Sequence, residues 1–300
     1  MRYDKAKAET QANRAMAVIA KARVLQSVGT YRDYRDCLKS FAQYIKDNRL
    51  GDLRQSTREI AERYLNDRKS DIKQKTLDQH RQAIQAFFVA KGELNKGEKL
   101  EIVKSTVETK LESRAYTPEQ VAAISQHQNE RNALATQIAY ASGLRAHELF
   151  TLRPVNERQA DIRHYSDGSV KALDTKFQGR QGEIYTVVGK GGLIREVLVP
   201  KELANRLEER RLNEPVKVRD RTVFYQSTYD IAGGKNWSSS FSNASKETLG
   251  WSTGAHGLRH SYAQERMVEL REYCPYEKAL ETVSQEMGHF REDITEVYLR

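Results

Sequence analysis

Hydrophobic and polar positions in the first third of the chain repeat with the period of an α-helix. Large apolar side chains recur three or four residues apart, most clearly in the stripe formed by Tyr31, Tyr34, Leu38, Phe41 and Ile45. Positions with this spacing lie on one face of a helix. The pattern therefore predicts helices that each bury one face, with tyrosine and phenylalanine in a core and not in a base-stacking surface.

Four helices are predicted in this region from the periodicity and from capping residues. The first spans about 9–26, and Thr30 is a candidate N-cap for the second. Ser56 and Glu59 have the spacing of a capping box at the start of the third. The fourth is expected to close near Gly92.

The helical pattern weakens between about 93 and 114, where lysine, glutamate, glycine and threonine replace large apolar residues. A new helix is predicted to begin at Pro118, since proline is favoured in a first turn. We interpret the weak stretch as a linker between two domains, residues 1–112 and residues 113–300.

The second domain is predicted to open with two helices, at about 118–127 and 130–142. Gly143 provides a turn after the second helix, and a further helix is expected to start at Leu144.

The only β-structure is expected at about 160–199, where apolar and polar residues alternate. The glycines of Gly189–Gly192 mark a hairpin tip. Helices are predicted to resume near Lys201 and, after the segment at 221–227, to continue to the end of the chain. The fold class expected is therefore mainly α with a small antiparallel β-sheet.

The distribution of charge along the chain indicates a class of binding partner. The 300 residues carry a formal net charge of +9. Residues 1–112 hold 24 Lys and Arg against 16 Asp and Glu, whereas residues 113–300 hold 26 against 25. A basic domain beside a nearly neutral one suggests that the first binds a polyanion, such as a nucleic acid. A basic surface without a partner remains the alternative.

Two other classes of protein are not indicated. Cys37 and Cys274 lie far apart and outside any CxxC motif, so neither a disulfide framework nor a zinc site is predicted. No apolar run approaches the roughly 20 residues that span a bilayer. We expect a cytoplasmic protein with no membrane segment.

The candidate chemistry is concentrated in the last 45 residues. His256 and Arg259 are three apart at a predicted helix start, so their side chains emerge on one face. His289 follows Gly288 at a helix end, and Tyr298 comes nine residues later. A hydroxyl nucleophile among basic donors suits an electrophile that is already an anion, and a phosphodiester is the best candidate.

Two upstream motifs, GLRAHEL and GKGG, complete the set of candidate catalytic residues. In chain order the set is Arg145, Lys190, His256, Arg259, His289 and Tyr298. This order resembles the tyrosine recombinase (phage integrase) family, whose catalytic set is Arg, Lys, His-x-x-Arg, His or Trp, and Tyr. The resemblance covers about 116–300, the family's catalytic domain. The basic N-terminal region is similar to the family's helical core-binding domain.

The resemblance implies a role for each of these residues. Arg145 and Arg259 would bind the nonbridging oxygens of a pentacoordinate phosphorus, and His289 would add a third donor. His256 would bind the phosphate or take the proton of Tyr298, which becomes the 3′-phosphotyrosine. The general acid for the departing 5′-oxygen would be Lys190.

Each residue also has a purely structural interpretation. Arg145 can pair with Glu148, which matches an acidic position of the family motif and is expected to orient the arginine. Lys190 can be a solvated hairpin residue, and Tyr298 can be an aromatic anchor of the last helix.

The sequence departs from the family pattern in two respects. The segment at about 163–182 is longer than in compact members, which makes Lys171 and Lys176 alternative candidates for the general acid. The sequence also ends two residues after Tyr298, where family members usually continue into a helix that couples subunits. We expect either another coupling surface or a trimmed chain.

The function implied is site-specific recombination of duplex DNA, as in integration or excision of a mobile element. The expected assembly is a homotetramer on synapsed sites and a monomer without DNA, with an accessory DNA-bending factor as a further partner. No cofactor and no metal ion are expected. Two alternatives remain: a type IB topoisomerase and a catalytically silent DNA-binding factor of the same fold.

Overall fold

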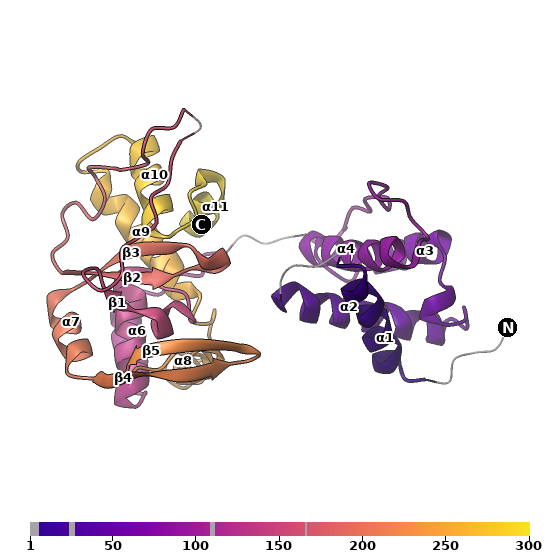
Figure 1. Cartoon of the computed structure of the whole chain (residues 1–300), viewed down its shortest axis with the longest axis horizontal. Coiled ribbons are helices and arrows are strands. Elements are labelled where there is room, and N and C mark those ends of the chain that lie inside the picture. The colour runs from indigo at the N-terminus through magenta and orange to yellow at the C-terminus, as the bar shows by residue number, and fades with distance from the viewer. Residues whose placement is uncertain (1–5, 24–27, 109–111, 166) are drawn as a thin grey trace. The chain divides into compact units, whose positions relative to one another are not determined.

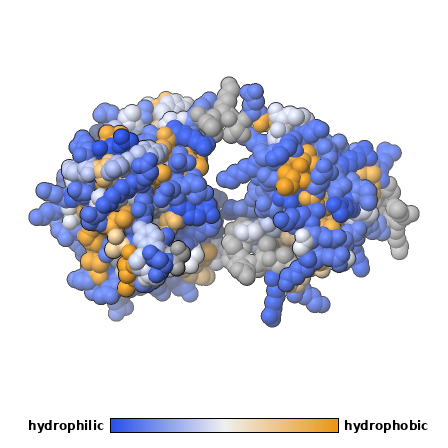
Figure 2. Space-filling view, turned by 90° about the horizontal axis from the view of Figure 1, so that it is seen from above, coloured by the Kyte–Doolittle hydropathy of each residue, from blue (hydrophilic) through white to orange (hydrophobic). Residues whose placement is uncertain are grey.

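The computed structural model describes residues 6–23, 28–108, 112–165 and 167–300. The chain forms two compact units, Met1–Lys110 and Leu111–Arg300 (Figure 1). In Figure 2, hydrophilic residues cover most of the visible face of each unit, and hydrophobic residues gather only in small separate patches.

The first unit is mainly helical between Ala8 and Lys91, and residues 92–108 follow without helix or strand, with Leu94, Leu100 and Val103 buried in its core. Its elements are α1 (Ala8–Lys21), α2 (Val28–Asp47), the 3₁₀ turn η1 (Leu53–Gln55), α3 (Arg58–Arg68) and α4 (Gln74–Lys91). Helices α1, α2 and α4 pack on one another, and α3 packs on α2 and α4. The core is apolar and includes the aromatic side chains of Phe41, Tyr64, Phe87 and Phe88. The four predicted helices and the burial of these aromatic residues are confirmed, although α1 ends at Lys21, and the predicted extension over 24–26 lies outside the described residues.

The predicted start signals of two helices are wrong, although the helices exist. Helix α2 begins at Val28, so Thr30 lies inside it and cannot cap it. At the start of α3 the cap position belongs to Thr57, while the hydroxyl of Ser56 donates to the carbonyl of Leu53 at 2.7 Å. Ser56 therefore closes the preceding 3₁₀ turn, and no capping box forms. The predicted end is confirmed, since Gly92 adopts a left-handed conformation there (φ 81°).

The second unit opens with the two predicted helices, α5 (Pro118–Gln126) and α6 (Glu130–Ser142). Thr117 and Gln120 form a reciprocal capping box at the start of α5. Gly143 ends α6 with φ 60°, and a Cβ atom there would lie 2.7 Å from the ring of Tyr262. Both the conformation and the contact require glycine at this turn.

The helix predicted from Leu144 does not form. The chain instead makes a turn at residues 145–147 and continues as the 3₁₀ segment η2 (Glu148–Thr151). The carboxylate of Glu148 accepts the backbone N–H of Arg145 at 2.8 Å and so closes this turn. A side chain thus replaces the backbone acceptor that a helix would supply.

The predicted β-region is confirmed only in part. Strands β1 (Arg153–Pro154), β2 (Glu183–Val188) and β3 (Ile194–Val199) form an antiparallel sheet in that order. The β2–β3 hairpin turns at Gly189–Gly192, as predicted, through the 3₁₀ turn η3 (Lys190–Gly192). Between 160 and 182 the described residues contain one isolated bridge, from His164 to Val170.

A second hairpin was not predicted. After α7 (Lys201–Glu208), strands β4 (Arg211–Asp220) and β5 (Val223–Tyr229) pair as a separate two-stranded sheet. Most of β4 and the first residues of β5 are exposed. A ribbon without one buried face lacks the contrast in hydrophobicity from which strands are predicted.

The unit ends in helices α8 (Gly234–Leu249), α9 (Gly257–Leu270), α10 (Tyr276–Glu286), α11 (Glu292–Glu296) and the 3₁₀ turn η4 (Val297–Leu299). Trp237 and Phe241 of α8 belong to the main core of the unit. Helices α9 and α10 share a smaller core that includes Tyr298 of η4. Within the described ranges, no helix combines the length and apolar character needed to cross a membrane.

Candidate active site

The smaller core carries a tyrosine surrounded by cationic and imidazole groups. Tyr298 is 9% exposed, and its hydroxyl lies 3.0 Å from Nε2 of His256. The ring centroids of His256, His260 and His289 lie 5.4, 4.6 and 4.9 Å from that of Tyr298. The guanidinium carbon of Arg259 lies 5.6 Å from the same ring. Four of the six candidate residues, Tyr298 included, therefore meet at one tyrosine side chain.

The histidines of this cluster are neutral at physiological pH. Loss of solvent around the rings, and then the nearby Arg259 guanidinium, lowers the pKa of His256 and of His289 to about 3. Burial lowers the pKa of His260 to about 4 in the same way. Neutral His256 has a lone pair available on one ring nitrogen, so it can accept a proton from the Tyr298 hydroxyl.

Arg259 links the helices of the second unit and fixes the tautomer of His289. Its side chain is fully buried, and it donates to the carbonyl oxygens of Gly143 and, at 3.0 Å, Met287. Its Nη2 also lies 2.9 Å from Nε2 of His289. Because a guanidinium can only donate, this Nε2 must accept. The imidazole proton is therefore on Nδ1, which lies 3.2 Å from Oγ1 of Thr295.

Arg145 reaches the cluster from the turn after α6. Its Nη1 donates to Oε1 of Glu148 at 2.7 Å, and its side chain keeps 19% of its surface exposed. A Cβ atom at Gly288, next to His289, would lie 3.9 Å from Nη1 of Arg145. The arginine therefore lies at the edge of the cluster, where it can meet a ligand from solvent.

Glu148 is a fully buried carboxylate that holds two arginines. Its second oxygen accepts Nη2 of Arg195 at 2.8 Å. Burial by itself raises the pKa of Glu148, but the guanidinium groups of Arg195, Arg259 and Arg145 outweigh it and hold the pKa at about 2. Glu148 is thus ionised, in a position to orient Arg145.

The sequence interpretation missed Arg195, which is 3% exposed. Besides its bond to Glu148, its Nη1 donates to the backbone carbonyl of Glu286 at 2.5 Å. Arg195 thereby connects the turn of Arg145 to the end of α10, just before His289. The sequence pattern could have revealed that Arg195 is buried, because in a strand it lies on the same face as Val197 and Val199, which are buried. An arginine among inward-facing valines indicates a buried charge with a partner.

Lys190 lies beside the cluster, but its side chain does not contact the cluster residues. The side chain is exposed at the β2–β3 tip and makes no hydrogen bond or ion pair with any described residue. The preceding Gly189 is close to the site, since a Cβ atom there would lie 3.3 Å from Oε1 of Glu148 and 3.8 Å from Nη1 of Arg145. The flexible lysine therefore extends from a backbone that borders Arg145.

The two alternative lysines are engaged elsewhere. Lys176 pairs with Glu196 at 2.7 Å, and the Lys171 ammonium lies 4.8 Å from the ring centroid of Tyr165. In the part of the chain that the structure describes, no group of three or more His, Cys, Asp or Glu side chains is arranged to hold a metal ion.

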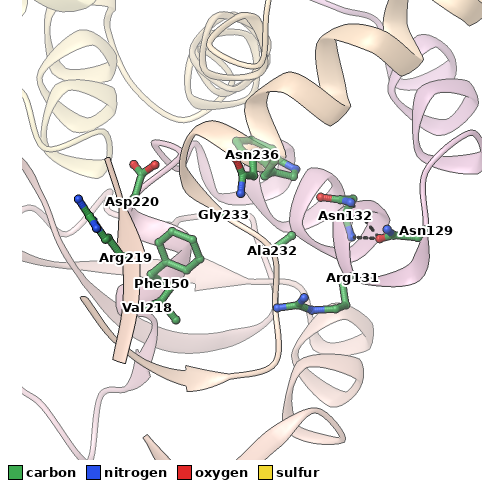
Figure 3. A pocket seen from close by; sticks show the side chains of 11 residues that line it. Asn129, Arg131, Asn132, Phe150, Val218, Arg219, Asp220, Ala232, Gly233 and Asn236 are labelled. Atoms are coloured by element: carbon green, nitrogen blue, oxygen red, sulfur yellow. Dashed lines mark hydrogen bonds between the residues drawn. The ribbon is translucent and has the colours of Figure 1, made fainter. Parts of the chain in front are cut away.

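A separate cavity of about 330 Å³ lies between the start of α6, strand β4 and the start of α8. Figure 3 shows its lining, which includes Phe150, Val218 and Asp220. None of the six candidate residues lines it, so it is distinct from the cluster around Tyr298.

Comparison with known proteins gives matches at the level of structure. No protein-family model matches the sequence, and no curated protein matches it. A solved lambda integrase tetramer bound to a Holliday junction is similar over 97% of this chain and 76% of its own, with 15% identity and a TM-score of 0.60. XerH site-specific recombinase in a post-cleavage complex with palindromic difH is similar over 96% of this chain and 81% of its own, with 16% identity and a TM-score of 0.58.

The Tn1549 transposon integrase in complex with transposon right end DNA is similar over 95% of this chain and 94% of its own chain, with 13% identity and a TM-score of 0.56. At these identities the likeness establishes the fold. The chain folds as these recombinases and integrases do. The predicted mainly α fold with a small antiparallel β-sheet is confirmed, and a second, two-stranded antiparallel sheet accompanies it.

Proposed function

We propose that this protein is a site-specific tyrosine recombinase, which cuts and rejoins duplex DNA through a 3′-phosphotyrosine intermediate. The observation that supports this most is the hydrogen bond between the Tyr298 hydroxyl and Nε2 of His256, in a cluster with Arg259 and His289. A tyrosine paired with a neutral base beside fixed cations suits attack on an anionic phosphodiester.

In the first step the Tyr298 oxygen attacks the phosphorus and its proton passes to His256. The bond from phosphorus to the 5′-oxygen of the neighbouring nucleotide breaks, and Lys190 supplies the proton to that oxygen. The products are a 3′-phosphotyrosyl link and a free 5′-hydroxyl. Because one phosphoester replaces another, a 5′-hydroxyl of a second strand can reverse the reaction without ATP.

Arg145 and Arg259 are proposed to neutralise the charge that builds on the nonbridging oxygens. Their guanidinium groups are held in place before the reaction by Glu148 and by backbone carbonyls, so little reorganisation is needed. His289 is proposed as a third donor to the phosphate. Since its Nε2 now accepts from Arg259, it must gain a proton or change tautomer to donate to a phosphate oxygen.

The basic N-terminal unit, residues 1–112 in the proposed division, is the candidate core-binding domain. Several of its exposed cations, including Arg54, Lys69, Lys73 and Lys75, are available to phosphates. Residues 113–300 form the proposed catalytic domain. We propose a monomer that assembles as a homotetramer on two synapsed sites, with an accessory DNA-bending factor as a further partner.

Covalent trapping tests this function. The protein is incubated with nicked duplexes that cover the DNA flanking its own gene, in EDTA, and the products are separated in SDS. A nick next to the cleavage site lets a short product leave and prevents rejoining. We expect a protein–DNA adduct that Tyr298→Phe abolishes, while duplex binding is retained.

The matched control is Tyr273→Phe, which removes a hydroxyl from an exposed tyrosine outside the cluster and should leave the adduct unchanged. An adduct that persists in Tyr298→Phe would refute the assigned nucleophile. Duplex binding without any adduct would favour a catalytically silent factor. Relaxation of supercoiled plasmids without a site requirement would favour a type IB topoisomerase.

A further inference from the structure

The β4–β5 hairpin has two chemically different faces. From Val216 onward the strands pair in register, with Val218 opposite Tyr225 and Arg219 opposite Phe224. Side chains alternate between the faces of such a ribbon. One face, which we call the outer face, presents Lys217, Arg219, Phe224 and Gln226, all of which are exposed. Val218, Asp220 and Tyr225 occupy the inner face and are partly buried.

The inner face is fixed to the body of the second unit. Asp220 accepts the backbone N–H of Lys235 at 2.9 Å, in the first turn of α8. Gly234 permits this contact, because a Cβ atom there would lie 2.6 Å from the carboxyl carbon of Asp220. Figure 3 shows Val218 beside Phe150, with the Arg219 side chain on the other side of the strand. The hairpin is therefore anchored on one side only.

The same inner face contacts the segment that presents Arg145. The ring of Tyr225 lies 6.1 Å from that of His147 and 5.8 Å from that of Phe150, measured between centroids. His147 stands between Arg145 and Glu148 in the sequence. The inner face of the hairpin thus contacts the segment that carries Arg145 and Glu148.

The outer face concentrates positive charge that no carboxylate neutralises. The ammonium of Lys217 lies 4.3 Å and the guanidinium carbon of Arg219 lies 5.9 Å from the Phe224 ring centroid. Across the described residues, neither these two cations nor Arg221 at the tip forms an ion pair. The arginine at the base of the hairpin differs, since Arg211 is paired with both Glu157 and Glu208.

We propose that the outer face of the β4–β5 hairpin binds phosphates of the duplex on which the Tyr298 site acts. The proposal rests on the proposed function, because it takes DNA as the substrate. Charge complementarity selects this occupant. Lys217 and Arg219 on the outer face and Arg221 at the exposed tip have no ion pair among the described residues, and duplex DNA offers a phosphate about every 1.7 Å of helix axis.

The aromatic ring and the shape of the ribbon suit the same partner. Phe224 restrains the two cations near its face, which lowers the entropy lost when they contact phosphates. A two-stranded ribbon also has dimensions that a DNA groove admits. Contacts of this kind hold a protein on DNA without reading its sequence, so they would position the duplex at the site.

The salt dependence of DNA binding tests the proposal. Binding of the full chain to a labelled duplex is measured by fluorescence anisotropy over a range of salt concentrations. The test variant combines Lys217→Gln, Arg219→Gln and Arg221→Gln. Each lost phosphate contact is expected to reduce the slope of log K against log salt by about 0.9, so three contacts would reduce it by roughly 2.7.

The matched control removes the same charge elsewhere in the second unit, by Lys201→Gln, Lys246→Gln and Arg271→Gln, all at exposed positions. We expect this control to change the slope far less than the hairpin variant. Circular dichroism melting verifies that both variants fold. A single variant, Phe224→Ala, keeps the cations and should weaken binding while preserving the slope.

Equal slopes in the hairpin variant and the unaltered protein would overturn the proposal, as would equal losses in the two triple variants. A hairpin variant that binds DNA normally but no longer assembles into multimers would also overturn it and would identify a contact between copies. Failure of the unaltered protein to bind any duplex would instead refute the proposed function itself.

Discussion

The two units of this protein solve the problem of a buried core in different ways. Among the described residues of the first unit, the buried polar side chains are Gln11, Ser56 and His80, and none carries a charge. The second unit, over the residues described for it, buries two carboxylates and three guanidinium groups. Those five are Glu148, Arg195, Arg259, Arg266 and Glu286.

Buried charges weaken a core unless each has well-placed partners. In the second unit the two carboxylates have them: Glu148 binds Arg145 and Arg195, while Glu286 binds Arg266 at 3.0 Å and the Tyr262 hydroxyl at 2.8 Å. The Nε atoms of Arg195 and Arg259 are buried without a hydrogen-bond partner. An apolar core of the same volume would give the folded unit an equal free energy of unfolding. The difference indicates that the second unit is built to hold cations in fixed positions, whereas the first is built to present a surface.

The largest effect is expected from Glu148→Gln. The amide cannot neutralise Arg145 and Arg195, and breaking a buried ion pair costs about 3–5 kcal/mol. The free energy of unfolding is measured by urea titration with tryptophan fluorescence, which reports the second unit because both tryptophans, Trp237 and Trp251, lie there. The control, Glu130→Gln, breaks an exposed pair with Arg206 and should cost under about 1 kcal/mol. Similar losses in both variants would refute the distinction.

Acid should destabilise the second unit more than the first. The folded pKa of His256, His260 and His289 is below that of the unfolded chain, so the unfolded state binds more protons, and stability falls as the pH drops below about 6.5. Between pH 7 and 5.5, His260 and His289 are each expected to contribute a loss of about 1 kcal/mol. His256 is more exposed and contributes less, because solvent screens its charge.

The first unit has one such histidine, His80, whose pKa burial lowers to about 4. It should therefore lose only about 1 kcal/mol over the same interval. Hydrogen exchange, corrected for the intrinsic effect of pH, separates the two units. A first unit that is lost before the second on acidification would contradict the comparison.

A change of shape without a change of charge should be tolerated in the first unit. Leu38 is fully buried in its apolar core, and Leu38→Met conserves volume, so the expected loss is under about 1.5 kcal/mol. The loss is measured by hydrogen exchange of the α2 amides. A loss as large as that of Glu148→Gln would mean that the first core is as specifically constrained as the second.

The smallest effect is expected at the surface of the first unit. Lys39 and Glu9 form an ion pair at 3.6 Å with both side chains about half exposed. Removing it by Lys39→Gln should change the unfolding free energy by less than about 0.5 kcal/mol. Thermal melting at low and high salt measures this. A larger or salt-independent change would show that the pair is part of the core and not of the solvated surface.

The sequence predicted the elements that depend on near neighbours. Helices α5 and α6 end within one residue of their predicted bounds, because proline, the Thr117–Gln120 box and Gly143 act through the local backbone. The β2–β3 turn was predicted from its glycines for the same reason, because glycine acts through the local backbone. The site residues were recognisable because their motifs are short and their order along the chain is distinctive.

Other features escaped because their causes lie far along the chain. The turn at Arg145 replaces a helix through one carboxylate contact, and Arg195 matters because it meets Glu148, 47 residues away. The β4–β5 hairpin forms although most of its residues are exposed, and its anchor is the start of α8. Periodicity carries no information about such contacts.

By itself the sequence determined that the first unit is helical, where α5 and α6 begin and end, which unit carries the excess charge, and which six residues are candidates for chemistry. Only the tertiary structure decided that Tyr298 meets His256, that Glu148 holds two arginines, and that Lys190 stays outside the cluster on an exposed tip. The physical reason is range: backbone conformation follows from residues within a few positions. The partners of a buried charge are set by the packing of elements from the whole unit.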